Sequence, residues 1–388
     1  MKKEPVSTFT PERTANFGRA EPSEPLIGFK QDVDFVVGAQ YGDEGKGMVA
    51  KLVADHVKYA WTARTGAQNA EHRFIHGGCE FCARILPSAC AFRPDIIAVL
   101  GAGHCFMPEQ LLLETVHLGI EPDRIIVDPH AMWLKPEHAE VNLATGNIRG
   151  TTGWGVGAAI AEKVRRQLGT QLIGDSEILA QAGVLCSRPV PQILQELKGP
   201  GLVEGSQGAM LSLDHGRYPY CTAKNVSVPA IAGELGLGLK RVRKVIGVVR
   251  LVFMRVPGPS GPTGGEETSF DAVEDRTGLR LPHHKRLQGD TTRWQASEKP
   301  DKAEEERLFD LSMDELRFTH YLNNYDYLAV TFTDYHRAGN YRVLDWSRLH
   351  EDTRKLINQL ESDIAPVLLI RTGQGEYDNI WLREVNWC

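Results

Sequence analysis

One stretch of the sequence, Asp34-Phe-Val-Val-Gly-Ala-Gln-Tyr-Gly-Asp-Glu-Gly-Lys-Gly47, joins a short apolar run to a glycine-rich turn that carries two carboxylates and a lysine. The apolar run predicts a buried strand, and the glycines let the backbone approach a ligand closely and present N–H groups to an anion. Apolar positions between Met48 and Val57 recur at helical spacing, so the turn precedes a helix N-terminus, where the helix dipole favours phosphate. The stretch therefore predicts a phosphate site.

This turn differs from a Walker A loop. With Gly45-Lys46 as the GK pair, the leading glycine would fall on Gln40, and the Ser or Thr expected after the lysine is Gly47. The chemistry therefore has to come from the carboxylates of the turn as well as from its lysine.

The composition limits the class of protein and its ligands. The chain has 388 residues, of which 42% are hydrophobic and 24% charged, as is ordinary for a soluble α/β protein. A net charge of -6 argues against general nucleic-acid binding. We expect no membrane partner, since no apolar run approaches the length of a membrane span and the N-terminus lacks the apolar core of a secretory signal. Seven scattered cysteines indicate reduced thiols and a cytoplasmic location.

The order of the patterns predicts the domain organisation. Residues 1–30 show little periodicity and are interpreted as a loosely ordered N-terminal extension. From residue 31 to 388, strand-like runs alternate with helical patterns, which predicts a single α/β domain with a mainly parallel central sheet and helices on both faces. Val245–Val256 is the longest strand-like run. The stretch 274–306 is rich in charges and turn formers and predicts a mobile loop that orders over substrate.

A predicted hairpin carries the residue types of a zinc site. Residues 73–86 form a hairpin pattern with Gly77 and Gly78 at the turn. Cys79 and Cys82, with His76 nearby, are possible zinc ligands, but the sequence offers no second ligand pair at suitable spacing. The hairpin interpretation is therefore favoured over a zinc site.

Two long motifs resemble one family, the adenylosuccinate synthetases and their bacteriophage relatives that act on a 2-aminopurine deoxynucleotide. Residues 40–47 match that family's Q-W/Y-G-D-E-G-K-G. Residues 203–208 and 214–222 read V-E-G-S-Q-G and D-H-G-R-Y-P-Y-C-T, close to V-E-G-A-Q-G and D-H-G-T-Y-P-Y-V-T of the family. The resemblance covers most of residues 34–380 and implies an adenylosuccinate synthetase-like fold, related to that of P-loop NTPases.

The resemblance implies a ligase that phosphorylates the 6-oxygen of a purine nucleotide and then lets the amine of L-aspartate displace the phosphate. Asp43 would act as the base at N1, Lys46 would hold the phosphates, and His72 would donate a hydrogen bond to O6 or the phosphoryl group. Gln207 would contact the 6-position, because its amide both donates and accepts. Mg²⁺ is the implied cofactor, with the Asp43 carboxylate and the backbone carbonyl of Glu71 as its ligands.

The family's binding loops carry over onto three groups of residues. The nucleoside monophosphate would be bound by Asn69, Thr151, Thr152, Arg166, Gln207 and Thr222. The nucleoside triphosphate would be bound by Gly42, Glu44, Gly45, Lys46, Gly47, Phe332, Asp334, Thr372 and Gly373. L-Aspartate would be bound by Thr291, Thr292 and Arg293. In the family, the arginine matching Arg166 reaches the substrate of the partner subunit, which implies a homodimer.

Departures from the family pattern leave three alternatives open. Phe332 replaces a lysine that stacks on guanine, and an aromatic ring stacks on any purine, so ATP or dATP becomes a possible donor. With the short chain, this favours the phage-type reaction, in which dGMP, L-aspartate and ATP or dATP give N6-succino-2-amino-2′-deoxyadenylate, in the host cytoplasm if the chain is phage-encoded. Asp43 favours the ordinary reaction with IMP and GTP, since phage enzymes often carry Ser there. Glu71 and the partial match at Thr291–Arg293 allow a non-catalytic relative, which the retention of the catalytic set argues against.

Overall fold

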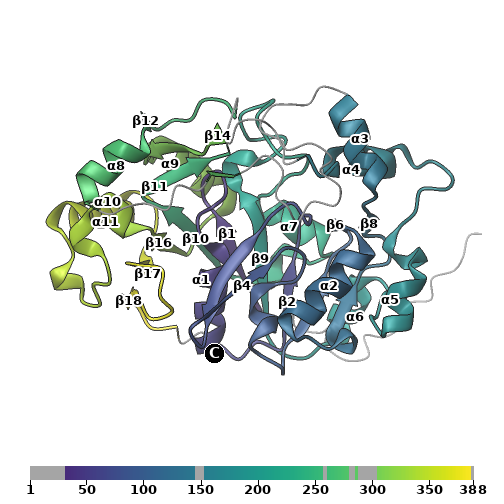
Figure 1. Cartoon of the computed structure of the whole chain (residues 1–388). Coiled ribbons are helices and arrows are strands. Elements are labelled where there is room, and N and C mark those ends of the chain that lie inside the picture. Colours follow the sequence, from purple (N-terminus) through teal and green to yellow (C-terminus); the bar gives the residue numbers. More distant parts are fainter. Residues whose placement is uncertain (1–30, 145–152, 257–259, 279–284, 287–303, 386–388) are drawn as a thin grey trace, which may run out of the picture. The chain divides into compact units, whose positions relative to one another are not determined.

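The structure is a computed structural model that describes residues 31–144, 153–256, 260–278, 285–286 and 304–385. In this part of the chain, nine strands form the central sheet (Figure 1). In spatial order they are β18 (Asn379–Trp381), β17 (Val367–Arg371), β16 (Tyr327–Thr331), β10 (Val242–Arg250), β1 (Val33–Gly38), β9 (Gly201–Gly208), β2 (Trp61–Arg64), β5 (Ile97–Leu100) and β7 (Ile125–Val127).

All neighbouring strands of this sheet are parallel except the edge pair of β17 and β18. The prediction of a mainly parallel sheet is therefore confirmed. Strand β1 lies in the middle, between β9 and β10, so the glycine turn that follows it leaves the centre of the sheet. In such sheets, ligands bind beyond the carboxyl ends of the strands.

Helices cover both faces of the sheet, as the alternation of buried residues along β1 shows. Val36 packs into one core, and Phe35 and Val37 pack into the other. The first core includes residues of α1 (Lys46–His56) and α2 (Pro108–Leu118). The second includes residues of α6 (Val190–Glu196), α7 (Val228–Glu234), α9 (Met313–Asn323) and α11 (Glu351–Asp363).

Smaller elements surround this frame. The predicted hairpin forms as β3 (His72–His76) and β4 (Cys79–Ala83). A second, antiparallel sheet has the order β11 (Val252–Arg255), β15 (Arg307–Asp310) and β12 (Glu267–Thr268). The other described strands and α-helices are β6 (Cys105–Phe106), β8 (Met132–Trp133), α3 (Pro136–Ala144), α4 (Val156–Arg165), α5 (Glu177–Ala182), α8 (Phe270–Thr277), β13 (Lys285–Arg286), β14 (Glu304–Glu305) and α10 (Thr333–His336).

Two predictions about the second half need correction. The run Val245–Val256 is not one strand, because the chain leaves the central sheet at Leu251 and continues into the antiparallel sheet as β11. Both halves are apolar and buried, so composition does not reveal the change of partner. The stretch 274–306 is also not all loop: α8 runs to Thr277, and β13 pairs with β14. The remainder of that stretch lies outside the described residues.

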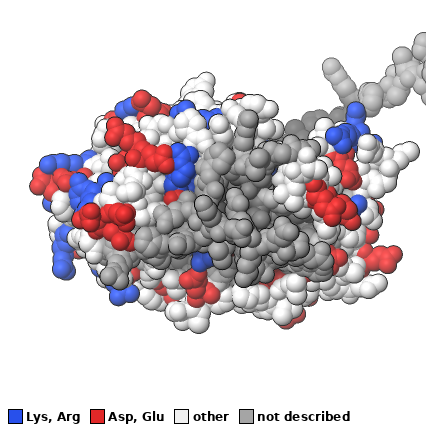
Figure 2. All heavy atoms as spheres, turned by 45° about the horizontal axis from the view of Figure 1, so that its top comes forward, with Lys and Arg blue, Asp and Glu red and all other residues white. Residues whose placement is uncertain are grey.

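The face in Figure 2 carries mixed charge. Where described residues are drawn, Lys and Arg side chains lie among Asp and Glu side chains. Among the described residues, no helix has the length and apolarity needed to cross a membrane.

Candidate active site

Loops that follow several strands of the central sheet line one cavity at the carboxyl ends of those strands. The cavity brings together predicted site residues from four separate segments of the chain: Gly42, Asp43, Gly45, Lys46, Gly47, Asn69, Glu71, His72, Gln207 and Thr222. The cavity is also lined by Tyr41, Trp154, Leu211, Tyr220 and Arg255. The mainly parallel sheet explains this convergence, because all of its parallel strands end on the same side.

Glu44 is predicted to bind the nucleoside triphosphate, but its fully buried side chain faces the interior of the glycine turn. Its carboxylate accepts hydrogen bonds from the backbone N–H groups of Gln40 (3.1 Å) and Gly42 (2.9 Å), and it pairs with Lys46 Nζ at 2.6 Å. A Cβ atom on Gly208 would lie 2.4 Å from Glu44 Oε1, so the neighbouring strand needs glycine at that position. Glu44 therefore shapes the turn and holds the lysine from inside.

Asp43 lies on the cavity side of the turn in a left-handed backbone conformation with φ 58°. Aspartate tolerates this conformation better than most residues do. The guanidinium of Arg250 supports it, since Nη1 donates a hydrogen bond to the Asp43 carbonyl oxygen at 3.0 Å. Arg250, the last residue of β10, is not among the predicted site residues, although it is one of only two charged residues in the apolar run 245–256.

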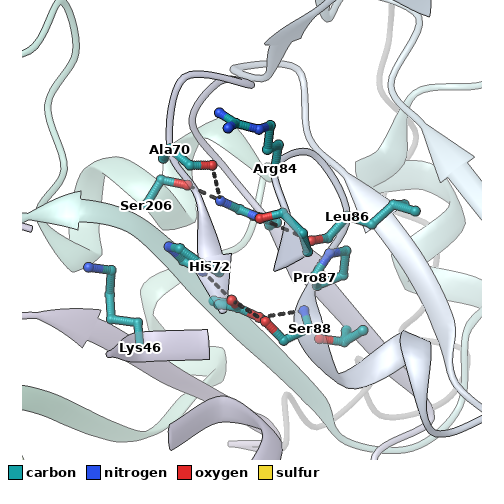
Figure 3. A network of polar contacts seen from close by, with 12 residues as sticks. Lys46, Ala70, His72, Arg84, Leu86, Pro87, Ser88 and Ser206 are labelled. Carbon is teal, nitrogen blue, oxygen red and sulfur yellow. Dashed lines mark hydrogen bonds and ion pairs between the residues drawn. The ribbon is translucent and has the colours of Figure 1, made fainter. Parts of the chain in front are cut away.

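His72 belongs to a buried network with Glu204 and Ser88 (Figure 3). Glu204 lies on β9, and its carboxylate contacts His72 Nδ1 and accepts hydrogen bonds from the Ser88 N–H (2.7 Å) and the Ser88 hydroxyl (2.8 Å). Arg64 lies next to this network and donates to the carbonyl oxygens of Ala70, Ala83 and Leu86. Arg64 thereby ties the loop before His72 to the end of the hairpin.

The surroundings set the charge of the His72–Glu204 pair. Burial lowers the pKa of His72 to about 4, and the positive charges of Arg64 and Lys46 act in the same direction. Burial raises the pKa of Glu204, but His72, Arg64 and the Ser88 N–H outweigh it and lower the value to about 2. At neutral pH, Glu204 is therefore ionised and the imidazole is neutral, with its proton on Nδ1.

This charge state refines the role predicted for His72. A neutral ring that donates from Nδ1 presents Nε2 as an acceptor. It becomes a donor at Nε2 when it takes up a proton, which an anionic phosphoryl group nearby would favour. The arrangement can therefore hold a proton at Nε2 once a phosphorylated ligand is present.

Gln207, on β9, has a side chain suited to a ligand. Its Nε2 lies 3.5 Å from Asn69 Oδ1, at the limit of a hydrogen bond. Its Oε1 is buried and has no hydrogen-bond partner among the described residues. A buried acceptor without a partner is costly, so a ligand N–H at this point would stabilise the site.

Three other predicted residues lie in different surroundings. Thr222 and Glu71 both line the cavity, and the Glu71 carboxylate pairs with Arg73 (2.5 Å) and Arg84 (2.7 Å). Arg166 follows the last residue of α4, is exposed and does not line the cavity. Thr151, Thr152, Thr291, Thr292 and Arg293 lie outside the described residues.

The residues predicted to hold the triphosphate base adjoin the glycine turn where β16 ends. Thr331, at the end of β16, donates its hydroxyl to the Glu44 carbonyl oxygen at 2.8 Å. Phe332 follows it, and the Arg250 guanidinium lies 3.6 Å from the ring centroid, so one face of the ring is covered. Asp334 is 5% exposed, and burial raises its pKa to about 6 against the opposing charges of Arg250 and Arg371.

Thr372 and Gly373 begin the loop after β17. The Thr372 hydroxyl donates to the Val343 carbonyl oxygen at 2.9 Å. A Cβ atom on Gly373 would lie 2.5 Å from Asp378 Oδ2, which explains the glycine. Neither residue lines the cavity described above.

Comparison with known proteins identifies the family. The family model described as adenylosuccinate synthetase matches residues 35–183 and 186–337. The chain belongs to the adenylosuccinate synthetase family. The synthetase of Thermococcus sibiricus is 32% identical over 358 residues, which are 90% of this chain and 98% of that protein. That of Archaeoglobus fulgidus is 31% identical over 345 residues, 87% of this chain and 94% of that protein.

Two solved structures of adenylosuccinate synthetase type share the fold. The succinoaminodeoxyadenylate synthetase (PurZ) of cyanophage S-2L, bound to dGMP and dATP, aligns with a TM-score of 0.74 and 24% identity, covering 92% of this chain and 97% of that one. The fully ligated adenylosuccinate synthetase of Plasmodium falciparum aligns with a TM-score of 0.75 and 19% identity, covering 91% and 100%. At these identities the likeness establishes the fold alone.

Membership of the adenylosuccinate synthetase family makes the chain an enzyme, a carbon–nitrogen ligase that uses a nucleoside triphosphate. The family binds a nucleoside monophosphate, L-aspartate and a triphosphate. Within the described residues, no three His, Cys, Asp or Glu side chains gather into a metal-binding group.

Proposed function

We propose that this synthetase condenses L-aspartate with C6 of dGMP, using ATP or dATP, to form N6-succino-2-amino-2′-deoxyadenylate. The observation that carries the chemistry is the convergence of Asp43, Lys46, His72 and Gln207 on one cavity. The choice of ATP or dATP as donor rests on Phe332, which replaces the lysine expected beside a guanine base. The choice of dGMP rests on Phe332 together with the short chain and the altered aspartate motif at Thr291–Arg293.

Each residue of this set has a role in the proposed reaction. Asp43 takes the N1 proton while O6 attacks the γ-phosphate, and Lys46 with the turn N–H groups holds the phosphates. His72 holds a proton at Nε2 against the transferred phosphoryl group. The buried Oε1 of Gln207 accepts from the N–H that appears at C6 when the aspartate amine attacks. Phosphate then leaves in place of the poor leaving group oxide.

The residues present fit a magnesium ion, which would neutralise charge on the phosphates. Mg²⁺ is usually held by one or two carboxylates together with substrate phosphates, and the Asp43 carboxylate lines the cavity beside the phosphate turn. Glu71 would contribute only its backbone carbonyl, because two arginines hold its carboxylate.

A second candidate reaction is the ordinary one, with IMP as acceptor and GTP as donor. Asp43 favours it, and the archaeal proteins at 30–32% identity carry the name adenylosuccinate synthetase. IMP and dGMP share O6 and N1–H, so the same catalytic residues serve both acceptors.

The test is L-aspartate-dependent phosphate release with dGMP or IMP, each combined with GTP, ATP and dATP. The proposal expects turnover on dGMP with an adenine nucleotide, and a product carrying the 2-amino group by mass spectrometry. Turnover on IMP alone would establish the second candidate. Absence of turnover with every pair, in a protein that still binds nucleotide, would contradict both and support a non-catalytic relative.

The ionisation of Asp334 gives a second test of the donor base. An ionised carboxylate accepts from N1–H and the 2-amino group of guanine, whereas a neutral carboxyl donates to N1 of adenine and accepts from its 6-amino group. Because the pKa of Asp334 is raised to about 6, the ionised fraction of its carboxyl increases between pH 5 and pH 7. We therefore expect the KM for GTP to fall about tenfold over this range and the KM for ATP to rise. Donor KM against pH checks this, with Asp334→Asn as the control that should flatten both curves. Parallel curves for the two donors would contradict it.

We also propose that the active enzyme is a homodimer. Arg166 is exposed at the end of α4 and is absent from the cavity lining, as expected of a residue that reaches the substrate of a partner subunit. An active protein that sediments as a monomer would contradict this.

A further inference from the structure

Arg255, the last residue of β11, is a buried cation that faces the cavity. Its side chain is 4% exposed and lines the cavity, with its guanidinium 4.4 Å from the centroid of the Tyr41 ring. Nη2 lies 3.5 Å from the carbonyl oxygen of Tyr220. Nε and Nη1 are buried and have no hydrogen-bond partner among the described residues. Two of its three nitrogens are thus left for a ligand.

Three other cations of the described residues, near Arg255 or in the same cavity, already have carboxylate partners. Lys46 pairs with Glu44 at 2.6 Å, and Arg217 pairs with Glu315 at 2.8 Å. Arg307 lies directly opposite Arg255 in the β11–β15 ladder and pairs with Glu267 at 2.6 Å.

The charge of Glu315 acts on Arg255, but Glu315 already has other hydrogen-bond partners. Its Oε1 also accepts from the Tyr41 hydroxyl at 2.5 Å and from the Gly264 N–H at 2.8 Å. Burial lowers the pKa of Arg255 to about 10, so the guanidinium remains charged at neutral pH. Among the described residues Arg255 forms no ion pair, and a buried cation with unpaired nitrogens in a cavity points to an anionic ligand.

We propose that Arg255 binds a carboxylate of L-aspartate, the dicarboxylate substrate of the proposed reaction, and this inference rests on that proposed function. A planar guanidinium is well suited to a carboxylate, with which it forms charge-assisted hydrogen bonds. The phosphates have other candidate partners in Lys46, the turn N–H groups and Thr222. In the sequence, the motif at Thr291–Arg293 lacks the arginines expected to bind the amino acid, so this substrate needs another cation.

The experiment compares Arg255→Met with the wild-type enzyme. Methionine keeps an apolar side chain of similar length over Tyr41 and removes the charge. We expect the KM for L-aspartate to rise about 10- to 100-fold, with the KM values of both nucleotides changed less than about threefold. Because the variant also removes an unpaired buried charge, its Tm should stay the same or rise by about 2–4 °C. Arg255→Lys should recover part of the affinity, since it restores the charge without the planar donors.

Arg276→Met is the matched control, because it removes an exposed arginine of α8 that pairs with Asp310 and does not line the cavity. It should leave all three KM values unchanged. An unchanged KM for L-aspartate in Arg255→Met would overturn the inference, as would a larger rise in the KM of the monophosphate, which would assign Arg255 to the phosphate. A lower Tm with all three KM values raised together would assign it a structural role.

A binding measurement separates failure of this inference from failure of the proposed function. L-Aspartate is titrated by calorimetry into the wild-type protein and into Arg255→Met, each saturated with dGMP or IMP. This measurement does not depend on turnover. If the wild-type protein binds L-aspartate and Arg255→Met does not, the inference stands even where no acceptor supports turnover. If the wild-type enzyme is active and both proteins bind L-aspartate equally, the inference about Arg255 fails while the proposed function stands.

Discussion

Asp43→Asn should lower kcat by about 100- to 10,000-fold while nucleotide binding changes little, because a general base contributes a factor of this size and an amide cannot take the N1 proton. The substitution keeps the size and shape of the side chain, and asparagine tolerates the left-handed backbone that residue 43 adopts. The hydrogen bond from Arg250 goes to the backbone carbonyl and is retained. The measurements are kcat for phosphate release and nucleotide dissociation constants by calorimetry.

Two further outcomes would be informative. Full activity of Asp43→Asn would exclude Asp43 as the base. A loss of activity with equally weakened triphosphate binding would indicate that Asp43 acts mainly by holding Mg²⁺, and titration with Mg²⁺ would then restore part of the activity. Asp55→Asn is a suitable control, since Asp55 is a partly exposed partner of Lys51 outside the cavity lining.

Glu204→Gln should lower kcat by about 100- to 10,000-fold, because a neutral amide replaces the ionised acceptor of His72 Nδ1. Its NH2 group can donate to Nδ1 and so favour the other tautomer, and loss of an ionised partner has effects of this order in histidine-dependent sites. The neutral amide can no longer stabilise a protonated ring, so His72 cannot hold a proton at Nε2 against the phosphoryl group. Steady-state kinetics with the preferred acceptor and donor measure the effect. The variant should also lose about 3 kcal/mol of stability, since Glu204 is fully buried beside Arg64.

Because Glu204→Gln also destabilises the fold, a control variant is needed in the network of His72, Glu204 and Ser88. Ser88→Ala removes the hydroxyl that donates to Glu204 and keeps both the backbone N–H bond and the His72 contact. We expect it to cost about 1 kcal/mol and to change kcat less than tenfold. A folded Glu204→Gln protein with kcat near the wild-type value would assign the network a purely structural role.

The free energy of unfolding at acidic pH should depend on the same pair, His72 and Glu204. The pKa of His72 falls from its usual value near 6.5 to about 4 on folding, so the folded state binds fewer protons than the unfolded state between these values. Stability is then fully present above pH 6.5 and declines as pH falls toward 4. The low pKa of Glu204 extends the decline below pH 4.

The sequence alone determined the parallel α/β class and most of the cavity. Strand-like runs alternating with helical patterns require crossover connections, and those place the loops at one edge of the sheet. Gly42, Asp43, Lys46 and Gln207 follow from this rule and from two long motifs, because local sequence sets both the turns and their positions at strand ends. His72 follows from the family resemblance.

Only the tertiary structure decided what each charged side chain faces. Glu44 and Asp43 are neighbours in one turn, yet Glu44 binds N–H groups inside it and Asp43 lines the cavity. Arg250 and Arg255 end two strands that read as a single run, and they lie in different sheets. Glu204 reaches His72 across 132 positions. Burial and counterion pairing depend on residues far apart in the chain, so spacing along the sequence cannot reveal them.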